Sequence, residues 1–192
     1  MNQHQNSGVQ RVVEAAARKG VDLDIRVLAG PVQGVEEEAA AVGADQGQVV
    51  QSLVFVATRL NGRLAPIVCL ISGRNRVEGG LLAAVIGETE VRRASAAEVR
   101  ELTGYSMTSV PPFGLGRDVR VVMDQDLGTH EWLWAAAGSD SAMLRVTPGV
   151  LRMLSNAFVT PLAAAPWVAS AVAQNAGPAM EGHLRFEAGS HA

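Results

Sequence analysis

The chain has 192 residues, of which 48% are hydrophobic and 18% are charged, and its formal net charge at pH 7 is −3. This length and apolar content suit one compact domain with a full core, and they exclude a disordered acidic chain. The 16 lysines and arginines are outnumbered by 19 acidic residues, which excludes a broad nucleic-acid-binding face and leaves only a small site that touches one terminal nucleotide.

The start of the chain is polar, and we predict a flexible tail over residues 1–8. This segment lacks the apolar stretch that directs secretion, and no apolar stretch elsewhere approaches the roughly 18 residues that a membrane span needs. We therefore expect a cytoplasmic protein with no membrane segment.

Two helices and a short strand follow the tail. Apolar residues recur at i, i+3, i+4 and i+7 from position 9, which predicts a helix over residues 9–19. Branched residues predict a strand over residues 24–28. A second helix is predicted over residues 32–42, ended by Gly43, and the three glutamates at 36–38 suit the positive end of its dipole. We expect that glutamate run to be structural.

The strongest strand signal belongs to a β-hairpin. Residues 48–58 (QVVQSLVFVAT) are rich in branched residues, Asn61-Gly62 supplies the positive φ angles of a tight turn, and residues 65–71 return. Cys69, the sole cysteine, lies in the returning strand. No intrachain disulfide can form, and we expect a buried, unreactive thiol.

Helices and short strands then alternate irregularly. Residues 77–86 predict a helix and residues 90–93 a short strand. Ser95 and Glu98 have the spacing of a capping box, which begins a helix that runs to Leu102.

Residues 104–116 (GYSMTSVPPFGLG) predict a loop, because they contain three glycines, two adjacent prolines and no sustained apolar period. Further strands are predicted over residues 119–123, 133–137 and 143–146. Thr147 then caps a helix that has Pro148 at its first position and ends near residue 155. A short extended segment, residues 158–161, closes the domain.

This order of elements predicts one domain over residues 9–165. Its fold class is α/β (α+β), with a mixed, largely antiparallel sheet and flanking helices. Residues 166–192 are rich in alanine, glycine, serine and glutamine without an apolar face, and we predict a C-terminal appendage.

Four segments in this order resemble the YbaK/prolyl-tRNA synthetase-associated aminoacyl-tRNA editing domain family. They are residues 49–55 (VVQSLVF), 74–78 (RNRVE), 98–114 (EVRELTGYSMTSVPPFG) and 133–148 (LWAAAGSDSAMLRVTP). The resemblance covers about residues 25–162.

The resemblance implies a deacylase that clears a small noncognate amino acid, such as alanine or cysteine, from tRNA, above all from proline tRNA. Members of the family position the ester with backbone amides, and the neighbouring ribose hydroxyl helps to activate water. We therefore expect no cofactor and no metal. The expected partner is the aminoacylated 3′ end of a tRNA, with an aminoacyl-tRNA synthetase as a further candidate. The oligomeric state and the amino acid stay open.

The resemblance also assigns the candidate site. Gln51 stands at the position of the family's lysine, and Thr108-Ser109 at that of its glycine pair. The catalytic candidates are Gln51, Gly104, Thr108 and Ser109. The substrate-binding candidates are Ser52, Arg76, Pro112, Gly114, Ala136, Ala137, Gly138 and Ser139. Small residues let a ligand approach the backbone, whose free N–H groups stabilise an ester oxygen as it gains charge, although the same residues suit a rigid connector or close backbone packing.

Gln51 leaves the activity open. Glutamine donates a hydrogen bond but carries no charge, so it loses the charge-assisted part of a phosphate contact, roughly 1–2 kcal/mol. One reading is a weakened enzyme, and another is an enzyme in which an arginine such as Arg74 or Arg76 compensates. The alternative is a catalytically silent module of the same fold that binds aminoacyl-adenosine-like ligands or a synthetase. An unrelated metabolic enzyme that uses the same cleft is a further reading.

Overall fold

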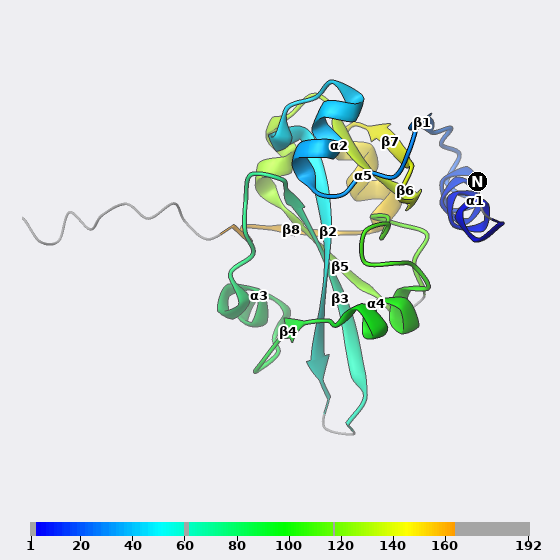
Figure 1. The fold of residues 1–192 in the computed structure, drawn as a ribbon. Helices are drawn as coiled ribbons and strands as arrows, with labels where there is room; N and C mark the ends of the chain where they lie inside the picture. The colour runs from blue at the N-terminus through cyan, green and yellow to red at the C-terminus, as the bar shows by residue number, and fades with distance from the viewer. Residues whose placement is uncertain (1–2, 60–61, 117, 164–192) are drawn as a thin grey trace, which may run out of the picture.

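The computed structural model describes residues 3–59, 62–116 and 118–163, in which eight strands form one sheet with helices around it (Figure 1). The strands are β1 (Asp24–Val27), β2 (Val49–Thr58), β3 (Leu64–Ser72), β4 (Arg92–Arg93), β5 (Arg120–Asp124), β6 (Leu133–Ser139), β7 (Ala142–Val146) and β8 (Phe158–Thr160). Their order in the sheet is β1-β7-β6-β2-β3-β5-β8, and β4 pairs with β2.

The sheet is mixed, as predicted. Four of its strand pairs are antiparallel: β1 with β7, β2 with β3, β2 with β4, and β6 with β7. Three pairs are parallel, β2 with β6, β3 with β5, and β5 with β8. The hairpin of β2 and β3 forms the long central axis in Figure 1 and pairs from Val50 opposite Ser72 to Thr58 opposite Leu64. Gly62 in its turn has a φ of 75°, and Asn61 lies outside the described residues.

The structure has a helix in each predicted range, but the second begins at Val35 and the third at Gly79, later than the predicted residues 32 and 77. The helices are α1 (Gln3–Ala17), α2 (Val35–Val42), α3 (Gly79–Ile86), α4 (Ala96–Thr103) and α5 (Pro148–Ser155), with short 3-10 turns at Gln46–Gln48 and Gln125–Thr129. Ser95 and Glu98 form the predicted capping box of α4, and Thr147 caps α5. None of the helices in the described ranges is long and apolar enough to cross a membrane.

The N-terminus differs from the predicted tail, because α1 begins at Gln3 rather than Val9. The cause is a backbone contact that polarity does not reveal. Gly8 is buried against Gly138, and a Cβ atom added at Gly8 would lie 2.2 Å from the Gly138 carbonyl oxygen. This close packing holds the first turns of α1 against β6 at Gly8. The domain division at residues 9 and 165 stays a prediction, and the predicted appendage lies outside the described residues.

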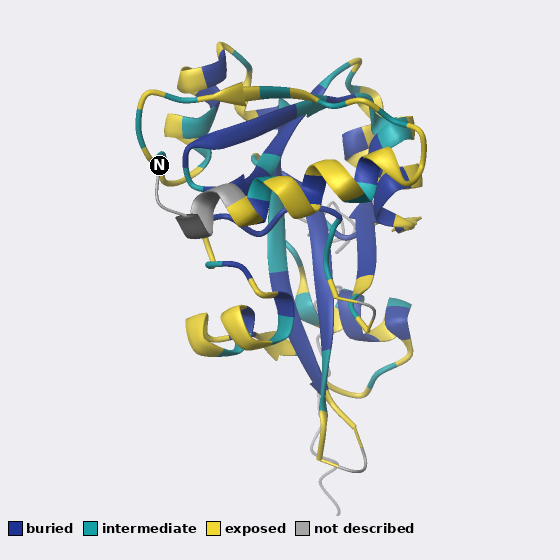
Figure 2. Cartoon of the chain, turned by 90° about the vertical axis from the view of Figure 1, so that its right-hand side faces the viewer, coloured by how far each residue is buried: buried dark blue, intermediate teal, exposed yellow. Residues whose placement is uncertain are grey.

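The core follows the strands. Buried residues are concentrated in the central strands, and the outer faces of the helices are exposed (Figure 2). The largest buried cluster joins α1, α4 and α5 to one region of the sheet, a second lies between the sheet and α3, and a third lies under α2. Cys69 belongs to the second cluster, and burial raises the pKa of its thiol to about 12, which agrees with the expected unreactive thiol.

Candidate functional site

A cavity of about 170 Å³ opens where β2 and β6 stop pairing. The parallel ladder between these strands ends with Val50 beside Ala135, and Gln51 and Ala136 are the next residues on each strand. The start of α2 and the loop after α4 close the cavity. We call it the Gln51 cavity, and its lining residues are Gly34, Glu38, Val50, Gln51, Ser52, Leu53, Met107, Thr108, Val110 and Ala136.

The Gln51 cavity unites four of the residues predicted for the site, Gln51, Ser52, Thr108 and Ala136. The hydroxyl oxygen of Ser52 is buried and has no hydrogen-bond partner among the described residues. A buried hydroxyl without a partner costs free energy, so its presence beside a cavity favours a hydrogen bond to a ligand. Ala136 contributes only a methyl group and therefore leaves room for a small acyl group.

The loop after α4 presents some of its backbone amides and uses others internally. The Gly104 N–H donates to the Arg100 carbonyl at 2.9 Å as the C-cap of α4, and the Ser109 N–H donates to the Ser106 carbonyl at 3.1 Å. These two amides are not available to a substrate in this conformation, contrary to the prediction of free N–H groups at these positions. The N–H groups of Met107, Thr108 and Val110 donate to no other described residue, and all three residues line the Gln51 cavity.

The hydroxyls that replace the family's glycine pair bind within the protein. Thr108 Oγ1 donates to Asp140 Oδ1 at 2.7 Å, and the hydroxyls of Ser106 and Ser109 lie 2.7 Å apart. Ser106 also reaches Asp140 at 3.3 Å. Asp140 follows β6, so this hydrogen-bonded group ties the loop to the turn between β6 and β7. The two extra hydroxyls therefore fix the position of the loop.

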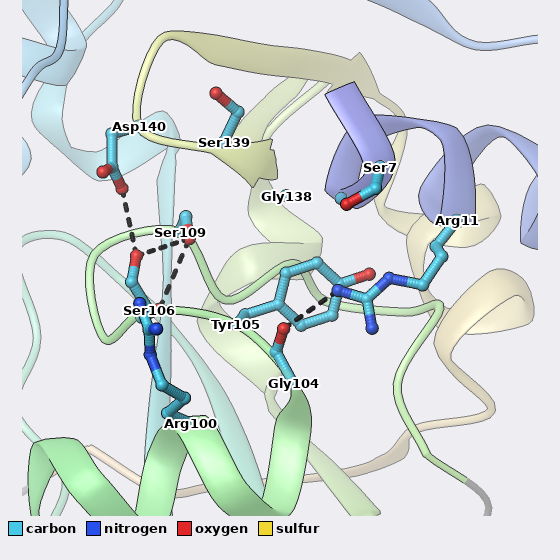
Figure 3. A pocket seen from close by; sticks show the side chains of 11 residues that line it. Ser7, Arg11, Arg100, Gly104, Tyr105, Ser106, Ser109, Gly138, Ser139 and Asp140 are labelled. Carbon is cyan, nitrogen blue, oxygen red and sulfur yellow. Dashed lines mark hydrogen bonds between the residues drawn. The ribbon is translucent and has the colours of Figure 1, made fainter. Parts of the chain in front are cut away.

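A second cavity, of about 370 Å³, is lined in part by Ser106, Ser109 and Asp140 of this group (Figure 3). We call it the Arg100 cavity, and its lining residues are Ser7, Gly8, Arg11, Arg100, Gly104, Tyr105, Ser106, Ser109, Gly138, Ser139 and Asp140. Arg11 lies over the Tyr105 ring at 4.1 Å from its centroid and donates to the Gly104 carbonyl at 2.9 Å. α1 thus forms one wall, and four further predicted residues, Gly104, Ser109, Gly138 and Ser139, lie in this second cavity.

The other predicted residues line neither cavity. Ala137 and Pro112 are buried, and Gly114, with a φ of 75°, packs against the backbone of Arg11 and Val12. Arg76 is exposed. Arg74, the other arginine considered as a substitute for the family's lysine, forms an ion pair with Asp45. The structure therefore divides the predicted site into two adjacent cavities and a supporting shell.

The described residues hold no group of three or more His, Cys, Asp or Glu side chains that suits a metal ion. The chemistry available in the two cavities is hydrogen bonding from amides and hydroxyls, together with the charges of Glu38, Arg11, Arg100 and Asp140.

Residues 29–154 match the model of the aminoacyl-tRNA editing domain family. The chain belongs to this family. A crystal structure assigned provisionally as a trans-editing enzyme for prolyl-tRNA synthetase is similar to it, with a TM-score of 0.74 and 36% sequence identity over 82% of this chain and 98% of that chain.

Two curated relatives show the settings in which the family occurs. The multifunctional Ser/Thr-tRNA deacylase ProXp-y of Escherichia coli (strain K12) is 28% identical over 60% of this chain and 68% of its own. A proline–tRNA ligase of Limosilactobacillus fermentum is 30% identical over 48% of this chain. The match spans only 16% of that ligase, so the family domain is a small part of the larger enzyme.

Sequence reasoning missed Glu38 and Arg100. Glu38 was included in a glutamate run that was expected to be structural, although it is three residues from Val35 and four from Val42 and therefore lies on the apolar side of its helix. Helical spacing alone would have separated it from Glu36 and Glu37. No pattern in the sequence pointed to Arg100. One wall of its cavity is α1, a helix that is distant from Arg100 in the sequence.

Proposed function

We propose that this chain hydrolyses the ester between a small amino acid and the terminal adenosine of a tRNA. One observation carries the proposal: in a chain of the editing family, Gln51, Ser52, Thr108 and Ala136 line a single small cavity. A cavity of about 150 Å³ accommodates a molecule of about six non-hydrogen atoms. The Gln51 cavity, of about 170 Å³, therefore suits an alanyl or cysteinyl group.

The loop supplies the electrostatic part of the proposed reaction. As water attacks the ester carbonyl, its oxygen gains negative charge, and a preorganised N–H donor stabilises such an oxygen by about 3 kcal/mol. Met107, Thr108 and Val110 offer the N–H groups for this role, and Pro111 with Pro112 stiffens the loop behind them. The neighbouring ribose hydroxyl of the substrate would orient the water, as the family resemblance implies. No charged side chain of the loop takes part.

The Arg100 cavity suits the nucleotide end of the substrate. Arg11 and Arg100 bring two guanidinium groups to it, against the single carboxylate of Asp140, which already accepts from two hydroxyls. Guanidinium groups bind phosphate oxygens through charge-assisted hydrogen bonds. In this proposal the 3′ end of the tRNA spans the hydrogen-bonded group, with its phosphate near the arginines and its acyl group in the Gln51 cavity.

A deacylation panel tests the proposal. The full chain is incubated with alanyl-, cysteinyl- and seryl-tRNAs carrying proline or alanine anticodons, and the remaining ester is measured over time. At least one ester should disappear faster than in buffer, and Gln51→Ala should slow that reaction by about tenfold if the carboxamide contacts substrate, equivalent to about 1.4 kcal/mol. Unchanged esters across the panel would reject the proposed hydrolysis.

The silent binding module is the second candidate, favoured by glutamine at the position of the family's lysine. Gln51→Lys separates the two. If the natural chain is inactive and the lysine variant hydrolyses one of the esters, the natural chain is a binding module. If the natural chain is active, the lysine is dispensable in this cavity.

A further inference from the structure

Glu38 lies on the inward side of α2. Side chains at i, i+3, i+4 and i+7 share one face of a helix. In α2 these positions are Val35, Glu38, Ala39 and Val42. Ala39 and Val42 are buried in a cluster under the helix, whereas Glu36 and Glu37 are exposed. A single carboxylate therefore stands in a row that is otherwise apolar.

No partner within the described part of the chain neutralises this carboxylate. Its side chain forms no hydrogen bond and no ion pair there, whereas the neighbouring Glu37 accepts from the Gln33 N–H at 2.9 Å. Burial raises the pKa of Glu38 above its ordinary value. An unpaired carboxylate that is partly removed from water costs folding free energy, and such groups in cavities are frequent at functional sites.

The position of Glu38 in the Gln51 cavity indicates what it would bind. It is the only charged residue among those that line the cavity, so its carboxylate faces no competing lysine or arginine there. Met107, Thr108 and Val110 from the loop belong to the same lining, and their N–H groups donate to no other described residue. The cavity thus combines one anionic acceptor with several neutral donors, and a fitting ligand carries a cation close to a carbonyl group.

We infer that Glu38 binds the α-ammonium group of the aminoacyl ester in the Gln51 cavity and selects acyl groups that carry a free amino group. In an aminoacyl ester the ammonium nitrogen is two bonds from the ester carbonyl carbon, so both fit within one cavity of this size. The inference rests on the proposed function, because it assumes that this cavity takes the acyl group. A charge-assisted hydrogen bond then orients the carbonyl toward the loop amides.

Binding of two matched, non-hydrolysable ligands tests the inference in the full chain. The first is 3′-alanylamino-3′-deoxyadenosine, which has the ammonium group. The second is its lactoyl counterpart, in which a hydroxyl replaces the ammonium with almost no change in shape. Calorimetric titration should give the wild type at least about tenfold tighter binding of the alanyl ligand, because only that ligand offers a cation for a charge-assisted hydrogen bond to the carboxylate.

The variants decide whether Glu38 is responsible. Glu38→Gln keeps the shape and should bind both ligands equally, near the affinity of the wild type for the lactoyl ligand. Glu36→Gln, which removes the same charge from the exposed side of α2, should keep the wild-type preference. A thermal melt of each variant confirms that it is folded, and if Glu38→Gln is not, Glu38→Asp should keep a reduced preference.

Several results would overturn the inference. They are a wild type that binds the two ligands equally or binds neither, a Glu38→Gln variant that keeps the preference, and one that loses both ligands to the same extent. The deacylation panel is independent of these titrations. If the chain hydrolyses an ester but binds the alanyl and lactoyl ligands equally, only the proposed role of Glu38 is rejected. If it prefers the alanyl ligand but hydrolyses no ester, only the proposed hydrolysis is rejected.

Discussion

The role that a single residue can take in this chain depends on whether its side chain lines a cavity or faces solvent. Glu38 and Glu36 have the same side chain and lie half a turn apart, yet one lines a cavity without a partner and the other is exposed. Gln51 shows the same dependence, because its carboxamide lies in a cavity lined also by Ser52 and by residues of the loop after α4. The local environment decides which of these groups can bind a substrate.

Because burying the Glu38 carboxylate costs folding free energy, replacing Glu38 with glutamine should raise the free energy of unfolding in a pH-dependent way. Burial raises its folded-state pKa above the ordinary value of 4.5, so the folded chain holds this proton more tightly than the unfolded chain. The contribution of Glu38 to the free energy of unfolding therefore falls as the pH rises above 4.5 and is constant beyond the raised folded pKa. Glu38→Gln should be more stable than the wild type at pH 7 and nearly equal to it at about pH 4.

Urea denaturation at the two pH values measures this difference. Glu36→Gln is the matched control, because it removes one charge from the exposed side of the same helix. A Glu38→Gln variant that is less stable than the wild type at pH 7 would show that the carboxylate is stabilising and already has a partner.

At the scale of elements, α1 is attached by a contact between two backbones. Gly8 in α1 and Gly138 in β6 approach so closely that a Cβ on either would lie within 2.7 Å of the other's carbonyl oxygen. Gly138 also has a φ of 86°, a backbone conformation that residues with a Cβ rarely adopt. Only glycine suits either position, and this contact forms one wall of the Arg100 cavity.

Gly8→Ala should therefore detach the first turns of α1 and destabilise the domain by about 1–3 kcal/mol, as overpacking of a close contact does. Urea denaturation gives the change in the free energy of unfolding, and hydrogen exchange of the α1 amides locates it. Gly149→Ala is the control, because no other atom lies within 4 Å of its added Cβ and α5 is a helix. It should be neutral or gain up to about 1 kcal/mol. Equal stability of the two variants would show that the Gly8 contact is loose.

At the scale of the whole molecule, Asp124 joins segments that are far apart in the sequence. It is buried at the end of β5, where it accepts from the Asn75 side chain at 3.0 Å and from the Leu162 N–H at 3.2 Å. Asn75 follows β3, and Leu162 follows β8 and is fully buried. One carboxylate thus holds the last described residues against the parallel part of the sheet.

Asp124→Ala should cost about 1–3 kcal/mol, because it leaves the buried Leu162 N–H without an acceptor, whereas the Asn75 side chain keeps Asp126 as its acceptor. Asp124→Asn keeps one acceptor oxygen for the Leu162 N–H and should cost less. Urea denaturation of both variants gives the comparison. A loss below about 0.5 kcal/mol for Asp124→Ala would mean that water replaces the carboxylate.

Local features of the sequence predicted the elements and the fold class. The capping box at Ser95, the proline-started helix after Thr147 and the branched run of β2 depend on neighbours within a few positions, and each is found where it was predicted. The segment order also indicated the family, which the match over residues 29–154 bears out.

The site depended on contacts between distant segments. The sequence placed Gly104, Ser109 and Gln51 in one candidate site, but the cap of α4 and a turn use the N–H groups of Gly104 and Ser109. Gly104 and Ser109 line the Arg100 cavity, whereas Gln51 lines the other cavity. The sequence by itself determined most of the strands, the capped ends of α4 and α5 and the family, because those follow from short-range periodicity and backbone preference. Only the tertiary structure decided that Glu38 lines a cavity and that α1 closes another, because burial and the fate of each amide depend on which distant segments pack together.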